Sequence, residues 1–251
     1  MNKIALVTGG SRGLGKDMAL SFAKNNTDVI LTYHNSKSEA NKIVAEIEKM
    51  GQKAMALPFD ISKSNAIDPF VETLATTLRS HWNTQSFDYL VNNAGVGATI
   101  PMAQVTEEQF DTLMNVHYRG VYFLTQKCLP MMNDFGCVIF ISSGTTRFCV
   151  PGYSVYSSLK AAIENLSKYV AKEYGSRGIR SNVIAPGPVE TDFNNAAIRN
   201  NPQMKAFLSG NSPLGRVGNA DDIGSVVAFV CSEEAKWING QRIEVSGGIN
   251  L

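Results

Sequence analysis

Two residues that could transfer a proton lie four positions apart in this chain. Tyr156 and Lys160 fall in a run whose apolar residues recur at helical spacing. Positions i and i+4 share one face of a helix, so the Lys160 ammonium can lie beside the Tyr156 hydroxyl. A nearby cation favours tyrosinate, which lowers the pKa of the phenol toward the range useful for proton transfer. Alone, the pair is more often a surface tyrosine beside a solvated lysine, so other motifs must decide.

A glycine-rich turn near the start of the chain is the second candidate. Apolar residues 4–7 precede Thr8-Gly9-Gly10-Ser11-Arg12-Gly13-Leu14-Gly15, and apolar residues at helical spacing follow. The predicted order is therefore strand, turn, helix. Glycines let the backbone approach a phosphate, and a helix start offers free N–H groups and the positive end of its dipole. Such a turn can also merely join a strand to a helix, but its context favours dinucleotide binding.

Together these motifs resemble the short-chain dehydrogenase/reductase family, in its classical branch. The glycine spacing is Gly9-x3-Gly13-x-Gly15, and Tyr156-x3-Lys160 follows downstream. Several matches in family order over nearly the whole chain are more specific than any one of them. After the glycine-rich turn the matching elements are Asp60, Asn92-Asn93-Ala94-Gly95, Asn115, Ser143, Tyr156, Lys160, Pro186-Gly187 and Thr191.

The resemblance implies catalytic roles for four residues. Ser143 would hydrogen-bond the substrate carbonyl oxygen, and Tyr156 would give that oxygen a proton as hydride reaches carbon. Lys160 would lower the pKa of Tyr156 and hold the nicotinamide ribose, while Asn115 would position a water linking Lys160 to solvent. The physics is coherent, because hydride transfer builds negative charge on the oxygen that Ser143 and Tyr156 face. Taken singly, Ser143 could instead cap a strand end, and Asn115 could be a buried amide.

The cofactor contacts implied by the turn and by the resemblance spread along the chain. They are Gly9, Ser11, Arg12, Gly13, Leu14, Gly15, Asp60, Ile61, Asn93, Ala94, Gly95, Tyr156, Lys160, Pro186, Gly187, Val189 and Thr191. By resemblance, Asp60 would accept from the adenine amino group, and Val189 and Thr191 would hold the nicotinamide carboxamide. Plain turn or capping roles for Asp60, Asn93 and Thr191 remain open.

The residues after the second predicted strand favour NADP(H) over NAD(H). An NAD site usually offers a carboxylate there for the ribose 2′-OH, but this chain reads Tyr33-His34-Asn35-Ser36-Lys37, with no acid before Glu39. A 2′-phosphate would instead be attracted by cations and hydroxyls. The residues expected to contact it are Arg12, His34, Asn35 and Ser36. The alternative for Arg12 is a solvated turn residue.

Short apolar runs alternate with helical patterns around these motifs. Strands are predicted at 3–7, 28–32, 53–57, 87–91, 137–141, 179–184 and 242–245. Helices are predicted at 14–25, 37–50, 64–80, 107–131, 154–175 and 220–232. Nearly all-apolar strands are typical of a parallel sheet covered on both faces, and the alternation implies right-handed crossovers. We therefore predict an α/β fold: one Rossmann-type, doubly wound sheet of seven parallel strands in a single domain, residues 1–251, as the resemblance also implies.

Two segments do not follow these patterns. Residues 81–86 are predicted as a polar loop. Residues 187–218 contain several prolines, asparagines and glycines, and cannot form one regular helix. A long segment after a strand of such a sheet is well placed to cover a ligand, and the resemblance puts the substrate loop there. A static surface loop is the alternative.

The bulk composition excludes several classes of function. A chain of 251 residues, 44% hydrophobic and 18% charged, suits one globular domain. Its net charge of +1 gives no case for a nucleic-acid partner, and no apolar run approaches the roughly 20 residues of a membrane span. The first predicted strand begins so near Met1 that we expect no signal peptide. The four cysteines lack metal-ligand spacing, so we expect no metal and free thiols in the cytoplasm.

The sequence thus predicts an oxidoreductase that reversibly reduces a ketone or aldehyde to an alcohol with NADPH. The Tyr-x3-Lys gap argues against the enoyl-reductase branch, which uses a longer gap, and the pattern is close to 3-oxoacyl-thioester reductases. An acidic carrier protein would need a basic docking patch. Residues 133–136 (Asn-Asp-Phe-Gly) lack one, although Arg177 and Arg180 partly compensate. The alternative is a non-catalytic dinucleotide sensor, which would be expected to have lost a catalytic residue.

The resemblance also implies a homotetramer, or a homodimer, with helices 107–131 and 154–175 at the interface. Their large apolar side chains are Phe110, Leu113, Tyr122, Phe123, Leu124, Leu166 and Tyr169. These side chains could face the sheet instead, and the sequence does not separate the two possibilities.

Overall fold

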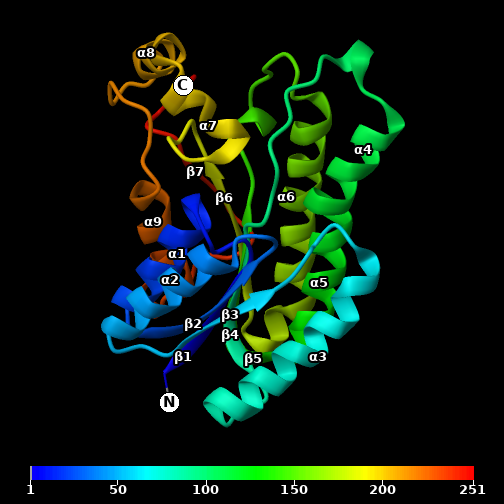
Figure 1. Cartoon of the computed structure of the whole chain (residues 1–251), viewed down its shortest axis with the longest axis vertical. Helices are drawn as coiled ribbons and strands as arrows, with labels where there is room; N and C mark the ends of the chain where they lie inside the picture. Colours follow the sequence, from blue (N-terminus) through cyan, green and yellow to red (C-terminus); the bar gives the residue numbers. More distant parts are fainter. Residues whose placement is uncertain (1) are drawn as a thin grey trace.

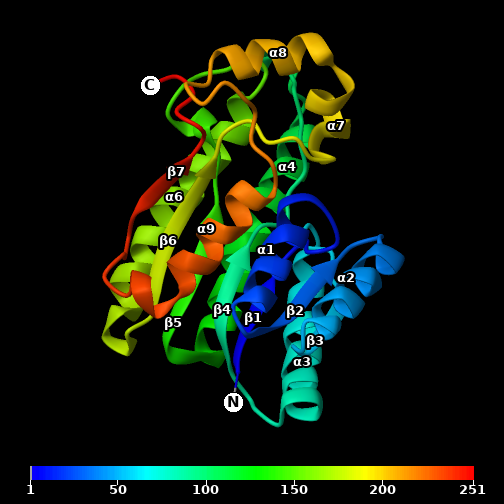
Figure 2. The ribbon, with the colours of Figure 1, turned by 90° about the vertical axis from the view of Figure 1, so that its left-hand side faces the viewer.

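The computed structural model describes residues 2–251, and within them a sheet of seven parallel strands forms the middle layer (Figure 1, Figure 2). The strands are β1 (Lys3–Val7), β2 (Thr27–Tyr33), β3 (Ala54–Pro58), β4 (Phe87–Asn92), β5 (Met132–Ile141), β6 (Arg180–Pro186) and β7 (Arg242–Val245). Their spatial order is β3-β2-β1-β4-β5-β6-β7, so the winding direction reverses between β1 and β4. This doubly wound topology confirms the predicted fold class.

Helices cover both faces of the sheet and enclose two separate cores. One face carries α1 (Gly13–Lys24), α2 (Lys37–Lys49) and α9 (Asp221–Cys231). The other carries α3 (Ile67–Thr77), α5 (Gly120–Cys128) and α6 (Ser154–Tyr174). Met18 and Phe22 are buried in the first core, and Leu74 and Leu124 in the second. Burying a side chain of this size stabilises the fold by about 1.5–3 kcal/mol, so each face holds its own helices.

The predicted helix 107–131 is not regular along its length. α4 (Glu107–Met114) passes into a π-helical stretch, η4 (Asn115–Arg119), before α5 begins. A Cβ at Gly120 would lie 2.2 Å from the Ile61 carbonyl oxygen, so the chain passes here only with glycine. π-helical stretches often occur at functional sites, because they turn a side chain away from the regular helical face.

The prediction of a polar loop at residues 81–86 is wrong for the first two residues. His81 and Trp82 end a π-helical turn, η2 (Leu78–Trp82), that continues α3. Trp82 is buried, and its Nε1 donates to Asp28 Oδ2 at 2.9 Å. Apolar packing and this bond outweigh the polar neighbours in sequence. The loop begins at Asn83, which has a left-handed backbone (φ 54).

The irregular segment 187–218 contains two short helices, α7 (Phe193–Asn200) and α8 (Pro202–Gly210). Three residues of α7, Asn194–Ala196, have left-handed backbone angles (φ 52, 57 and 56). Both helices stand beyond the carboxyl ends of the strands (Figure 1). The segment is therefore not one regular helix, as predicted. In residues 2–251 we find no helix with the length and apolar character of a bilayer span.

Candidate active site

The predicted catalytic and cofactor residues gather at one edge of the sheet. In a parallel sheet the carboxyl ends of all strands lie at the same edge, and ligands bind there. Ser143 follows β5, Thr191 follows β6, and Tyr156 and Lys160 lie in the first turns of α6. The glycine-rich turn follows β1 at the same edge. The fold therefore unites segments separated by more than half of the chain.

Tyr156 lies among other aromatic rings. Its side chain is only 9% exposed, and the ring of His117 meets it edge-on with centroids 5.1 Å apart. The rings of Tyr153 and Phe193 lie at 6.0 and 6.3 Å. Burial raises the pKa of Tyr156, while the side chain of Ser143 acts in the opposite direction by hydrogen bonding. The phenol is therefore a protonated donor at neutral pH.

Lys160 is buried beside the Tyr156 ring. Its side chain is 5% exposed, and its Nζ lies 5.6 Å from the centroid of that ring. Nζ donates to the Ile141 carbonyl oxygen at 2.7 Å. Burial lowers the pKa of Lys160 to about 8. The sequence predicted that Lys160 lowers the pKa of Tyr156, but in this structure desolvation outweighs any such effect.

The two serines after β5 have different partners. Ser142 Oγ donates to Glu164 Oε1 at 2.6 Å and is held in the fold. Ser143 Oγ accepts from the Thr145 N–H at 3.2 Å and from the Thr145 hydroxyl at 3.0 Å, while its own proton is left for another acceptor. Ser143, and not its neighbour Ser142, thus has a hydroxyl proton that the surrounding chain does not use, and its catalytic role stays a prediction. It also shows the capping role that the sequence left open.

The glycine-rich turn is shaped by close contacts. Gly9 and Gly13 have left-handed backbone angles (φ 68 and 55), and a Cβ at Gly15 would lie 2.2 Å from the Gly9 carbonyl oxygen. Asn93 Nδ2 donates to the Thr8 carbonyl at 2.8 Å and so braces the turn from β4. No side chain in the described chain caps the start of α1 at Arg12. The free N–H groups at this helix start suit a phosphate, so the residues present fit the predicted dinucleotide.

The segment after β6 lies over this turn. A Cβ at Gly13 would come within 3.6 Å of Thr191 Cβ. Val189 pairs with Gly218 in a short parallel bridge that fixes the start of the segment. Thr191 Oγ1 accepts from the Phe193 N–H at 3.2 Å, so its capping role is also present. Thr191 thus lies next to Gly13 of the glycine-rich turn, and the contacts of Val189 and Thr191 with the nicotinamide carboxamide stay predictions.

The residues predicted to select NADP(H) lie in the turns after β2 and β1. Arg12 is exposed, and we find no salt bridge to its guanidinium in residues 2–251. His34 Nε2 lies 3.4 Å from Asp60 Oδ2, and Ser62 donates to the same carboxylate. Burial raises the pKa of Asp60, but the bonds from Ser62 and the charges of His34 and Lys63 outweigh it and lower that pKa. The remaining predicted contacts at this edge are Ser11, Leu14, Asn35, Ser36, Ile61, Ala94, Gly95, Pro186 and Gly187.

Comparison with known proteins decides the family. A family model described as "Enoyl-(Acyl carrier protein) reductase" matches residues 9–250. "3-oxoacyl-[acyl-carrier-protein] reductase FabG" of Staphylococcus epidermidis is 34% identical over 253 residues, covering 100% of both chains. The chain belongs to the short-chain dehydrogenase/reductase family.

Other relatives of this short-chain dehydrogenase/reductase are named for ketone reduction on rings. "Hydroxynaphthalene reductase-like protein Arp2" of Metarhizium brunneum is 35% identical over 257 residues, covering 98% of this chain and 94% of its own. The solved structure of the "angucycline C-6 ketoreductase LanV with bound NADP" superposes with a TM-score of 0.93 at 35% identity, covering 98% of this chain and 95% of its own. Similarity of this extent covers every motif discussed above.

Sequence reasoning missed His117 in this short-chain dehydrogenase/reductase. Asn115 begins the π-helical stretch, and its carbonyl accepts from the Gly120 N–H. The side chain that reaches the Tyr156 ring is that of His117, two residues later. The only signal in the sequence is a histidine in an otherwise apolar helical run. The role predicted for Asn115 stays a prediction.

Arg177 and Arg180, the residues predicted to compensate in part for a missing basic patch, both have partners within the chain. Arg177 Nε pairs with Asp134 Oδ1 at 2.8 Å. Arg180 is buried, and its guanidinium donates to main-chain carbonyls at the end of α9 and just beyond it, among them those of Val230 at 2.7 Å and Ser232 at 3.2 Å. Each guanidinium already has a partner within this short-chain dehydrogenase/reductase, so neither is available to bind an acidic protein.

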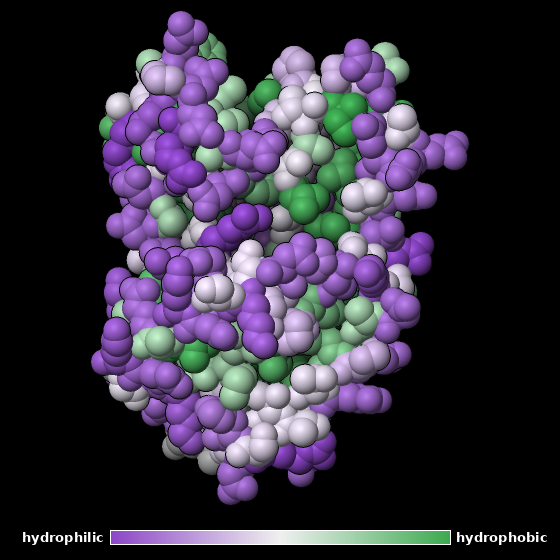
Figure 3. Space-filling view, viewed as in Figure 1, coloured by the Kyte–Doolittle hydropathy of each residue, from purple (hydrophilic) through white to green (hydrophobic). Residues whose placement is uncertain are grey.

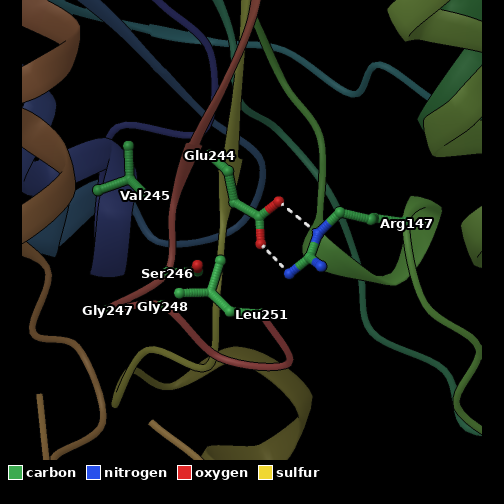
Figure 4. A pocket seen from close by; sticks show the side chains of 7 residues that line it. All are labelled: Arg147, Glu244, Val245, Ser246, Gly247, Gly248 and Leu251. Carbon is green, nitrogen blue, oxygen red and sulfur yellow. Dashed lines mark hydrogen bonds and ion pairs between the residues drawn. The ribbon is translucent and has the colours of Figure 1, made fainter. Parts of the chain in front are cut away.

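A cavity of about 510 Å³ lies near the carboxyl terminus (Figure 4). Its lining residues are Arg147, Glu244, Val245, Ser246, Gly247, Gly248 and Leu251. Arg147 reaches across it to Glu244 with bonds of 2.8 and 2.9 Å. None of the lining residues is a predicted site residue, but the cavity adjoins one, because the Gly187 N–H donates to the carbonyl of the lining residue Val245 at 3.0 Å.

A hollow lined by apolar side chains opens between the α4 side and the α7–α8 side of the molecule (Figure 3). The exposed large apolar residues on the segments around it are Val96, Met102, Phe193 and Phe207. Phe193 belongs both to this set and to the aromatic surroundings of Tyr156.

Proposed function

We propose that this protein is an NADPH-dependent reductase that converts a ketone attached to a ring system into the alcohol, reversibly. The observation that carries this proposal is the aromatic environment of Tyr156, with Tyr153 and Phe193 beside the phenol. Flat aromatic side chains pack well on a flat ring substrate. The names of several relatives point to the same substrate class. The intact set of catalytic residues and these relatives leave no support for the sensor alternative.

The proposed mechanism assigns one task to each side chain. When bound, NADPH supplies the hydride. The Ser143 hydroxyl donates to the substrate carbonyl oxygen, and the Tyr156 hydroxyl transfers its proton to the same oxygen. Both donors stabilise the charge that develops there. Lys160 uses one of its three N–H donors on Ile141, so the others are available to ribose hydroxyls.

NADP(H) is the proposed cofactor on three grounds. The start of α1 is uncapped and suits a phosphate, and Arg12 is an exposed cation beside it. The turn after β2 holds no acid that would repel a 2′-phosphate. Solved relatives are described with bound NADP or NADPH. Residues 187–218, with α7 and α8, are the proposed substrate loop.

A 3-oxoacyl thioester is the second candidate substrate, favoured by the full-length match to FabG. The short gap between Tyr156 and Lys160 favours carbonyl reduction over enoyl reduction. Docking of an acidic carrier protein is disfavoured because Arg177 and Arg180 are engaged internally. We therefore expect the thioester, if reduced at all, to be accepted without a carrier.

The test is NADPH consumption by the purified protein on a panel of carbonyl compounds. The panel holds bicyclic aromatic ketones, an acetoacetyl thioester, small diketones, keto sugars and aromatic aldehydes. We expect the bicyclic ketones to be reduced fastest, and Tyr156→Phe to lose turnover by about a hundredfold or more with NADPH affinity retained. Tyr169→Phe, on an exposed part of the same helix, is the matched control. Near wild-type turnover by Tyr156→Phe refutes the mechanism, and preference for the thioester refutes the substrate class.

A cytoplasmic homotetramer, or a homodimer, is the proposed assembly. Of the apolar residues predicted at the interface, Leu113 and Leu124 are buried in the protomer. Phe110, Tyr122, Phe123 and Tyr169 are exposed on α4, α5 and α6, which supports the proposal. The free thiols support a reducing compartment. Light scattering that reports a monomer overturns the assembly.

A further inference from the structure

His117 is a buried histidine whose protonation state the structure defines. It is 1% exposed, and its Nε2 lies 2.8 Å from the Val96 carbonyl oxygen. A carbonyl only accepts, so Nε2 carries the proton and Nδ1 is left as an acceptor. The Val96 N–H lies 3.4 Å from the same Nε2, and the 2.8 Å bond to the carbonyl oxygen outweighs this longer contact. Burial, with the nearby charge of Lys160, lowers the pKa of His117 to about 3. The ring is therefore neutral.

The acceptor Nδ1 has no hydrogen-bond partner in residues 2–251, although it is buried. Buried polar atoms in proteins almost always have a partner, so an unpaired one indicates a ligand or a water. Lys160 has the complementary surplus, because an ammonium has three donors and one of them is bonded to Ile141. His117 Nδ1 thus lacks a donor, whereas Lys160 has N–H donors without an acceptor, and both side chains are buried.

The position of His117 joins two parts of the site. Its ring meets the Tyr156 ring at an interplanar angle of 86°. On its other side, a Cβ at Gly95 would lie 3.0 Å from His117 Cε1. Gly95 and Val96 follow β4, in the segment predicted to lie against the cofactor. The same imidazole therefore contacts the proton donor and the loop on the cofactor side.

We propose that His117 is a positioning residue of the reduction centre: its ring holds Tyr156, and its Nδ1 accepts a hydrogen bond from a water that also accepts from Lys160. The role rests on the proposed carbonyl reduction. When the Tyr156 O–H bond breaks, its proton goes to the substrate oxygen and leaves a tyrosinate. Lys160 then gives a proton to the tyrosinate oxygen. Lys160 regains a proton from the water, and the water regains one from solvent. His117 stays neutral throughout.

Two substitutions test the His117 ring and its Nδ1 acceptor independently. His117→Phe keeps a ring against Tyr156 but removes Nδ1, whereas His117→Gln supplies an amide oxygen as acceptor without the ring. We expect His117→Phe to lower kcat by about tenfold or more, with KM and the NADPH dissociation constant changed by less than about twofold. We expect His117→Gln to recover part of the lost kcat. His81→Phe, in an edge-on pair with Trp82 far from the site, should leave kcat unchanged.

Wild-type kcat in a folded His117→Phe protein overturns the proposal. A second measurement does not depend on turnover. Nitrogen NMR of the labelled His117 ring should show the neutral Nε2–H tautomer, and a charged ring or the Nδ1–H tautomer overturns the proposal. If no carbonyl compound is reduced, the proposed function fails, and the NMR result still decides the state of His117.

Discussion

Ser142 Oγ donates to Glu164 Oε1 at 2.6 Å, so the residue before Ser143 is bonded directly to the helix that carries Tyr156. The same oxygen accepts from the Thr146 hydroxyl at 2.7 Å and from Arg242 Nε at 2.9 Å. One carboxylate of α6 thus holds both ends of the loop that contains Ser143, and ties that loop to β7.

Glu164→Ala should therefore disturb the position of Ser143. Three donors would lose their acceptor, and we expect the free energy of unfolding to fall by about 1–3 kcal/mol. We also expect kcat to fall more than KM rises, because the proposed role of Ser143 is to donate to the reacting oxygen. Urea denaturation and steady-state kinetics measure the two effects. Glu48→Ala, on the exposed face of α2, is the control, and equal behaviour of the two variants contradicts the prediction.

Gly15→Ala should damage the glycine-rich turn. The added Cβ would lie 2.2 Å from the Gly9 carbonyl oxygen and 2.6 Å from Asn93 Nδ2. The backbone must shift, so we expect a loss of about 2 kcal/mol or more in stability and weaker NADPH binding. Gly175→Ala is the matched control, because a Cβ there meets nothing within 4 Å. Thermal denaturation and NADPH fluorescence titration test both, and a Gly15→Ala protein as stable as Gly175→Ala would refute this account.

Lys160 should make stability depend on alkaline pH. Its pKa is about 8 in the fold, against about 10.4 when unfolded, so the unfolded chain binds more protons between these values. Stability therefore rises as pH increases from about 8 to about 10, by at most about 3 kcal/mol. Lys160→Met should lack this rise, whereas Lys172→Met, on an exposed position of α6, should keep it. Denaturation at a series of pH values gives the answer, and the same slope in both variants rules out a buried ammonium.

Arg12→Ser should reduce the preference for NADPH over NADH. A bond from a guanidinium to a phosphate contributes about 1.5–3 kcal/mol, so we expect NADPH affinity to fall by about tenfold or more. NADH affinity should change little, because NADH has no 2′-phosphate. Arg79→Ser, which removes an exposed arginine beyond α3, serves as the charge-matched control. Equal losses for the two cofactors would mean that Arg12 does not contact the 2′-phosphate.

The sequence predicted the strands and most helices because their signals are local. Runs such as Val29-Ile30-Leu31 are apolar on both sides and are buried between helices. The spacing of Tyr156 and Lys160 likewise fixed their shared helical face. The alternation of strands and helices then predicted that the strands run parallel. In a parallel sheet the predicted site residues, which follow the strands, lie at one edge.

Features that depend on distant contacts were not predicted. Trp82 is buried with a bond to Asp28, and Arg180 is buried with its guanidinium bonded to carbonyls at the end of α9. His117 reaches Tyr156 through a π-helical stretch, whose wider turn changes which side chain faces α6. Helical spacing in the sequence assumes regular turns, so it could not indicate this residue.

The two cores of the fold have a consequence for how this protein can vary. α1, with the glycine-rich turn, packs in one core, whereas α6, with Tyr156, packs in the other. The proposed binding of the nucleotide and the proposed delivery of the proton are therefore anchored in layers that pack on opposite faces of the sheet. Substitutions beneath α1 can tune cofactor affinity while the surroundings of the phenol stay as they are, and substitutions beneath α6 can do the reverse. Cofactor affinity and turnover can therefore change independently of each other in variants of this protein.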